Sequence, residues 1–188
     1  MSNEWRTPQF EYTWLRVASR HYSDFWQVTR DALMFATKKL SLELTSEKRE
    51  KLMNAHLELN IWPDVIPALR SLKNSGLQLA FLPNFTAKMV EANVRHSGLD
   101  GIFAHALSTD LAKTYKPDPL AYKLAIDVFK LKRGEILFAA FAGWDAAGAK
   151  LFGYPTFSVD RQKLPPEEMG AVPDSSAETL SQLARSLV

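Results

Sequence analysis

The chain has 188 residues and a formal net charge of +2, with 46% hydrophobic and 23% charged residues and no cysteine. Such a chain is long enough to bury one core, and the missing cysteines exclude disulfides, thiolate metal sites and thiol nucleophiles. The basic residues are scattered, no apolar run approaches the ~20 residues of a membrane span, and the N-terminus lacks the apolar core of a signal peptide. We therefore expect a cytoplasmic protein with no nucleic-acid or membrane partner.

The first sixty residues predict helices and no strand. Large apolar residues recur three and four positions apart in residues 11–22 and 23–40, and Ser23 or Asp24 can cap the second segment. A third segment, residues 45–59, opens with Thr45 and Ser46 followed by acidic residues, as the start of a helix does.

From Trp62 onward, short apolar runs alternate with amphipathic segments. This alternation predicts βαβ units, a parallel sheet and right-handed crossovers, with the chemistry at the carboxyl ends of the strands. The expected strands are residues 77–84, 105–109, 135–142 and 155–160, and the expected helices are residues 63–76, 86–98, 118–131, 145–153 and 176–187.

Polar side chains follow three of these strands. Asn84, Lys116 and Asp145 supply an amide, an ammonium and a carboxylate that can converge on one crevice. Together they can bind an anion, keep a carboxylate nucleophile ionised and orient it. Two simpler interpretations stay open at this point: Asp145 is also a typical helix cap, and Lys116 is also a typical surface residue.

Several other chemistries lack their sequence signals. The chain contains no Gly-x-Ser-x-Gly elbow, no glycine loop that cradles phosphate and no paired-histidine metal motif. The four histidines are isolated in the sequence. We therefore expect no metal site and no cofactor.

Three segments together resemble a known family: "EYTWLR" near the start, "YKPDPLAY", and "AGWDAAGAKLFGYPTF". The sequence is similar to the haloacid dehalogenase superfamily, in particular to its type II branch, the L-2-haloacid dehalogenases. The resemblance covers nearly the whole chain. It implies an α/β fold with a doubly wound, Rossmann-like parallel core (residues 61–188) and an α-helical cap (residues 1–60), with the first core strand missing.

The resemblance also implies a reaction on 2-haloalkanoic acids. An aspartate on the first strand displaces halide from the α-carbon, and water then hydrolyses the resulting ester. Lys116 matches the lysine that pairs with the nucleophile. Asp145 matches the acid that positions that lysine and the water, and Arg6 matches the cap arginine that receives the halide. Asn84 matches an amide beside the substrate, and the residues matching the pocket lining are Phe10, Phe25, Tyr122 and Trp144.

The chain departs from the family pattern in two places. No Asp-x-Tyr-Gly-Thr segment, which carries the nucleophile in the family, is present, and we regard Asp110 and Asp160 as poor substitutes. Pro83, Ala140 and Ala142 stand where relatives often carry hydrogen-bonding residues. We therefore expect the 188 residues alone to be inactive.

Two other functions stay open. One is a phosphatase, which needs Mg²⁺ held by several acids, although "AGWDAAGAK" offers only Asp145. The other is a catalytically dead relative that binds a partner or a small acid. Relatives are commonly dimers through their helical parts, so the resemblance also implies a homodimer.

Overall fold

The computed structural model describes residues 2–188, which form two compact units. Unit 1 runs to Asn60 and also contains Leu82–Gly98 and Leu107–Tyr115, whereas unit 2 contains Ile61–Phe81, Leu99–Ala106 and Lys116–Val188. The predicted boundary between residues 60 and 61 coincides with the first border between the units. Two segments of the predicted core nevertheless cluster with the N-terminal helices. The assignment of a cap and a core stays a prediction.

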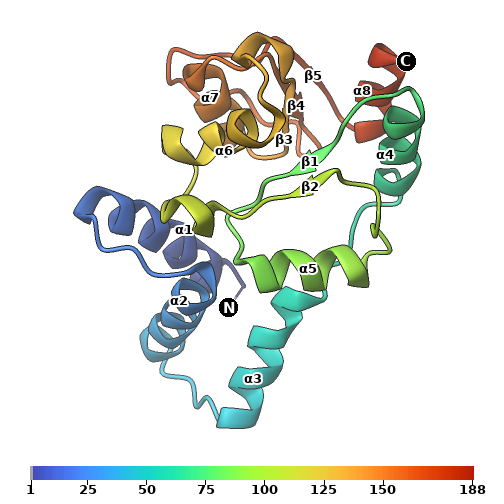
Figure 1. Ribbon diagram of the computed structural model, residues 1–188. Helices are drawn as coiled ribbons and strands as arrows, with labels where there is room; N and C mark the ends of the chain where they lie inside the picture. Colours follow the sequence, from blue (N-terminus) through green and yellow to red (C-terminus); the bar gives the residue numbers. More distant parts are fainter. Residues whose placement is uncertain (1) are drawn as a thin grey trace. The chain divides into compact units, whose positions relative to one another are not determined.

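Unit 1 is helical, as the sequence predicts for its first sixty residues. Its helices begin where a side chain can cap them: Asp24 accepts a hydrogen bond from the Gln27 amide, Thr45 from Lys48 and Thr86 from Met89. Helices α1 and α2 pack side by side (Figure 1). The elements are α1 (Ser2–Ser19), α2 (Phe25–Lys39), α3 (Ser46–Asn54), the short helix η1 (Ala55–Leu57), α5 (Ala87–His96) and the short helix η2 (Thr109–Ala112).

The buried centre of unit 1 joins residues from distant parts of the sequence. Phe25 and Val28 on α2 pack with Met89 on α5 and with Tyr115, and all four are almost inaccessible to solvent. Burial of large apolar side chains is the main stabilising contribution here. This packing explains why residues 82–98 and 107–115 belong to the same unit as the first sixty.

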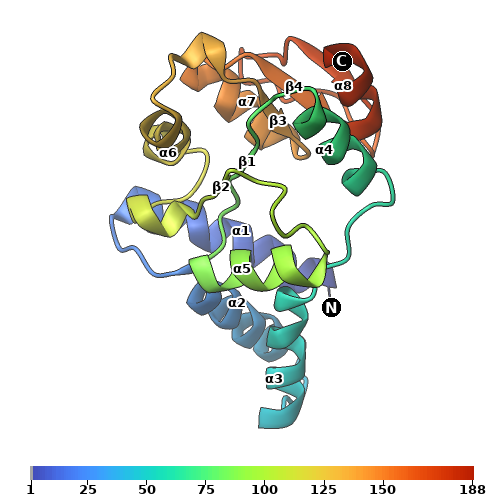
Figure 2. The same cartoon turned by 45° about the vertical axis from the view of Figure 1, so that its right-hand side comes forward.

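Unit 2 is an α/β unit with parallel strands (Figure 2). Strand β1 (Ala80–Phe81) pairs with β2 (His105–Ala106), and a second sheet has the order β3-β4-β5. Its strands are β3 (Phe138–Ala140), β4 (Thr156–Val159) and β5 (Ser175–Ala177), and its helices are α4 (Val65–Asn74), α6 (Pro119–Phe129), η3 (Arg133–Glu135), α7 (Gly143–Phe152) and α8 (Leu180–Leu187). Helix α4 packs against α8, and α7 packs against β3 and β4.

The predicted alternation of strands and helices is confirmed, but several predicted boundaries are wrong. The predicted strands 77–84, 105–109 and 135–142 are shorter, at Ala80–Phe81, His105–Ala106 and Phe138–Ala140. Residues 176–187 do not form one helix, because Ser175–Ala177 pair with β4 as an edge strand and α8 begins only after the Thr179 cap. The first helix starts at Ser2 rather than near residue 11 and contains Pro8. Nowhere in residues 2–188 is a helix both long and apolar enough to cross a membrane.

Candidate functional site

Lys116 lies in the turn that leads into α6. Asp118 caps this helix by accepting a hydrogen bond from the Leu120 amide, and Pro119 occupies the first helical position. The local sequence therefore starts α6 three residues after Lys116 and leaves the lysine outside the helix. Only 7% of Lys116 is exposed, so the interpretation as an ordinary surface residue is wrong.

Asp145 is the third residue of α7 and follows the buried end of β3 by five residues. Ala142, whose side chain has no polar atom, occupies the N-cap position of this helix. The carboxylate of Asp145 instead accepts hydrogen bonds from two side chains outside α7, so the interpretation as a plain helix cap is wrong. The positive end of the helix dipole additionally favours a carboxylate in this first turn.

Lys116, Asp145 and Tyr122 form one buried group, which we call the Asp145 cluster. The Lys116 Nζ donates to Asp145 Oδ2 at 2.5 Å, and the Tyr122 hydroxyl donates to Oδ1 at 2.8 Å. The two charged side chains are 8% and 11% exposed. Both carboxylate oxygens are therefore bonded to donors in an environment where electrostatic interactions are stronger than in water.

Aromatic rings from β3, from the end of α7 and from the segment before β4 surround Tyr122. The ring centroids of Phe138, Phe152 and Tyr154 lie 5.3, 5.7 and 6.4 Å from that of Tyr122. Burial, together with the charge of Asp145, raises the pKa of Tyr122 far above its ordinary value. The Tyr122 hydroxyl thus remains a proton donor to Asp145 at neutral pH.

The sequence did not single out Tyr154 as a site residue, although it stands in the quoted Gly-Tyr-Pro segment. Its hydroxyl donates to the Tyr122 carbonyl oxygen at 2.6 Å. Burial raises the pKa of Tyr154 to about 12, so this hydroxyl also keeps its proton. A tyrosine between glycine and proline is the only sequence signal that could have pointed to this contact.

The five other predicted site residues are divided between the two units. Trp144 is half-buried beside Asp145 on α7. Asn84, Phe25, Phe10 and Arg6 belong to unit 1.

Within unit 1, these four residues have different surroundings. The guanidinium of exposed Arg6 lies 5.3 Å from the centroid of the Phe10 ring. Phe25 packs against Phe85 in the buried centre, which is the core-packing role that a buried phenylalanine commonly has. Asn84 is only 8% exposed and precedes α5.

Unit 1 contains a comparable group around Asp110, which we call the Asp110 cluster. Tyr22 and Lys113 each donate a hydrogen bond of 2.7 Å to Asp110 Oδ1. Hydrogen bonds from Lys113 and Tyr22 hold the pKa of Asp110 below its ordinary value. The Lys113 side chain is 66% exposed and that of Asp110 30%, so this group is in contact with water.

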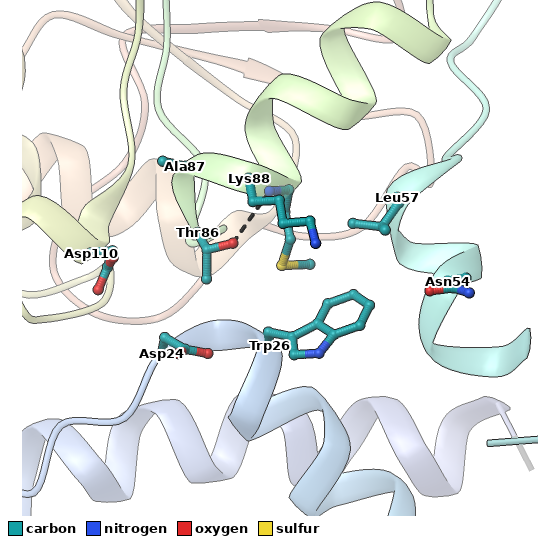
Figure 3. A pocket seen from close by; sticks show the side chains of 9 residues that line it. Asp24, Trp26, Asn54, Leu57, Thr86, Ala87, Lys88 and Asp110 are labelled. Atoms are coloured by element: carbon teal, nitrogen blue, oxygen red, sulfur yellow. Dashed lines mark hydrogen bonds between the residues drawn. The ribbon is translucent and has the colours of Figure 1, made fainter. Parts of the chain in front are cut away.

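A cavity of about 410 Å³ also lies in unit 1 (Figure 3). Thr86, the cap of α5, faces it and accepts the Met89 amide hydrogen bond at 3.2 Å. None of the eight predicted site residues lines this cavity, whose lining residues are Asp24, Trp26, Asn54, Leu57, Thr86, Ala87, Lys88, Met89 and Asp110.

The surroundings of Asp145 offer few ligands for a cation. Ala146 and Ala147 follow it on α7, and Ala140 and Ala142 precede it. In the part of the chain that the structure describes, no three acidic or histidine side chains are grouped so that they could hold a metal ion. Lys116 instead supplies the positive charge beside Asp145.

Residues 8–153 match the family model described as haloacid dehalogenase-like hydrolase. The chain is 44% identical over 170 residues to the (S)-2-haloacid dehalogenase of Pseudomonas sp. (strain YL), covering 90% of this chain and 73% of that protein. It is 38% identical over 183 residues to (S)-2-haloacid dehalogenase 4A of Burkholderia cepacia, and this match covers 97% of this chain and 79% of that protein.

A solved structure gives the same result for the fold. The crystal structure of the L-2-haloacid dehalogenase RSc1362 superposes with a TM-score of 0.96 at 36% identity, covering 99% of this chain and 84% of that one. The parallel strands and flanking helices of the predicted fold class are therefore those of a haloacid dehalogenase-like protein.

Proposed function

The chain belongs to the haloacid dehalogenase-like hydrolases, and from that premise we propose that it acts as a hydrolytic dehalogenase of 2-haloalkanoic acids. In this reaction a carboxylate oxygen attacks the α-carbon, a C–O bond forms, and halide leaves with the electron pair of the broken carbon–halogen bond. Water then hydrolyses the ester, which releases a 2-hydroxy acid and regenerates the carboxylate.

The buried Lys116–Asp145 ion pair is the single observation that carries this proposal. An ammonium group shielded from water favours the ionised form of a nearby carboxylate, which is the form that can act as a nucleophile. Asp145 and Tyr122 fix the position of that ammonium group through the hydrogen bonds of the Asp145 cluster. We propose that Lys116 and Asp145 act directly in catalysis and that Tyr122 borders the substrate.

The remaining predicted residues have roles that follow from the chemistry of the substrate. Halide is the anion of a strong acid, so it leaves without a proton but needs positive or hydrogen-bonding partners. We propose that Arg6 binds the departing halide and that Asn84 binds the substrate carboxylate. We further propose that an apolar lining excludes water from the site, and that this lining is made of Phe10, Phe25 and Trp144.

The source of the nucleophile is part of the proposal. The resemblance implies an aspartate in an Asp-x-Tyr-Gly-Thr segment, and the 188 residues contain no such segment. That these residues alone are inactive stays a prediction. The assays therefore use the protein isolated from its native source.

A phosphatase is the second candidate, because phosphate transfer is the common chemistry of the wider superfamily. A solved phosphatase of the superfamily from Thermococcus onnurineus shares the fold at 23% identity and a TM-score of 0.65. The alanines around Asp145 argue against it, because Mg²⁺ prefers several oxygen ligands.

Assembly and location also stay proposals. Trp14, Leu15 and Phe35, on α1 and α2, are 40%, 61% and 45% exposed, which supports association of two copies through unit 1. Light scattering of the native protein tests the homodimer, and cell fractionation tests the cytoplasmic location.

The test of the reaction is halide release from (S)- and (R)-2-chloropropionate, with and without EDTA, beside phosphate release from p-nitrophenyl phosphate. We expect the native protein to release chloride from the (S) substrate at a rate that EDTA leaves unchanged. Mg²⁺-dependent phosphate release would support the phosphatase. The absence of both activities in the native protein would support a relative that only binds.

A further inference from the structure

We propose that Gly148 is the positioning residue of the Asp145 cluster, an inference that rests on the proposed function of that cluster. Gly148 lies on α7, three residues after Asp145, and is buried. A Cβ atom added to it would lie 2.5 Å from the Tyr122 hydroxyl oxygen and 2.7 Å from Cβ of Pro117. Both distances are shorter than van der Waals contact, so a side chain at this position would force its neighbours to move.

The two atoms that a Cβ would meet belong to the segments that carry the donors to Asp145. Tyr122 donates its hydroxyl to Oδ1, and Pro117 directly follows Lys116, which donates to Oδ2. The absence of a side chain at position 148 thus lets both donors approach α7 closely enough to bond one carboxylate. Displacing either segment would lengthen at least one of these hydrogen bonds. The bond from Tyr122 fixes the Asp145 carboxylate, and that carboxylate in turn fixes the Lys116 ammonium.

Tyr122 cannot relieve such a contact by a small rotation. Its ring is fully buried and enclosed by Phe138, Phe152 and Tyr154. The hydroxyl is fixed to a rigid ring, so it cannot move aside as the terminal amine of a flexible lysine side chain could. The contact would therefore move the hydroxyl away from Asp145 or separate α6 from α7.

The requirement for glycine is one of space rather than backbone conformation. Gly148 lies inside a helix without a positive φ, where alanine ordinarily stabilises the backbone. Gly134, on η3 of the same unit, offers a matched control because its added Cβ would meet no atom within 4 Å. Comparing Gly148→Ala with Gly134→Ala thus isolates the effect of the close contact.

The first measurement is the NMR signal of tyrosine Cζ in native protein labelled at that carbon, with the Tyr122 signal assigned by Tyr122→Phe. This carbon reports the hydrogen bond of the hydroxyl and requires no activity. We expect Gly148→Ala to shift the Tyr122 signal and Gly134→Ala to leave it in place. In the halide assay, we expect Gly148→Ala to lower kcat at least tenfold while KM stays within twofold.

A second comparison keeps the proposal testable if Gly148→Ala folds poorly. Phenylalanine lacks the hydroxyl that the new Cβ would meet, so adding Gly148→Ala to Tyr122→Phe should lower the urea midpoint less than adding it to the native protein. The proposal fails if the double variant shows no such relief, or if the Tyr122 signal of Gly148→Ala is unchanged. If no variant, including the native protein, releases halide, the proposed function fails while the NMR signal still decides the role of Gly148.

Discussion

Each of the two units contains an aspartate that accepts hydrogen bonds from one lysine and one tyrosine. In unit 1, Lys113 is the third residue after Asp110, and its side chain is 66% exposed. In unit 2, Lys116 and Asp145 are 29 residues apart in the sequence, and their side chains are 8% and 11% exposed. The same three residue types therefore form a local surface group in one unit and a buried long-range group in the other.

This difference separates structural from chemical uses of the same residues. An exposed ion pair gains little, because water and salt screen its charges. A buried pair must offset a large desolvation cost, and a fold that retains one often uses its charge for chemistry. On this reasoning the Asp145 cluster, and not the Asp110 cluster, belongs to the proposed catalytic machinery.

Removing each lysine should give the largest contrast in stability. Lys116→Met leaves the Asp145 carboxylate buried without its cation, so we expect a loss of about 3–5 kcal/mol in the free energy of unfolding. Lys113→Met removes an exposed partner and should cost about 0–1 kcal/mol. Urea denaturation at pH 7 measures both, and equal losses would contradict the comparison.

Removing the hydroxyl of Tyr122 or of Tyr22 should change stability less than removing the lysines does, and the change should depend on pH. Burial is the main cause that raises the pKa of Tyr122, so the folded state holds this proton more tightly than the unfolded state does. Stability should therefore be intact below pH 10, the ordinary tyrosine pKa, and fall above it. Tyr122→Phe removes this contribution and should reduce the loss between pH 10 and 11 by about 1 kcal/mol.

Tyr22 supplies the control for that measurement. Burial also raises its pKa, but the residue is only half-buried, so water stabilises part of its ionised form. Tyr22→Phe should therefore reduce the alkaline loss less than Tyr122→Phe does. Denaturation curves collected from pH 9 to 11 compare the two variants. A larger reduction of the alkaline loss by Tyr22→Phe would contradict the conclusion that Tyr122 is the more deeply buried of the two hydroxyl groups.

The sequence could identify the charged members of the Asp145 cluster for a physical reason. Lys116 and Asp145 follow predicted strands, and the ends of parallel strands meet at one edge of a sheet. Tyr122 came from the family resemblance alone. Gly148 stands in the quoted segment "AGWDAAGAKLFGYPTF", but its proposed role follows only from the close approach of α6 to α7, which the structure shows.

The edge strand β5 shows the same limit for the fold. Ser175–Ala177 have a weak intrinsic preference for strands and are largely exposed, so their sequence resembles the start of a helix. They become a strand because β4 offers them a hydrogen-bonding partner. The predicted helices of residues 23–40 and 118–131, by contrast, carry their caps in the local sequence, and both are confirmed.

The most direct test of the catalytic account is the rate of halide release from (S)-2-chloropropionate by Lys116→Met and Lys113→Met forms of the native protein. We predict that Lys116→Met lowers kcat/KM by about 10²-fold or more, because it removes a charge placed for the reaction, while Lys113→Met stays within twofold. Circular dichroism would first establish that both variants are folded at the assay temperature. Equal activity of the two folded variants would contradict the account.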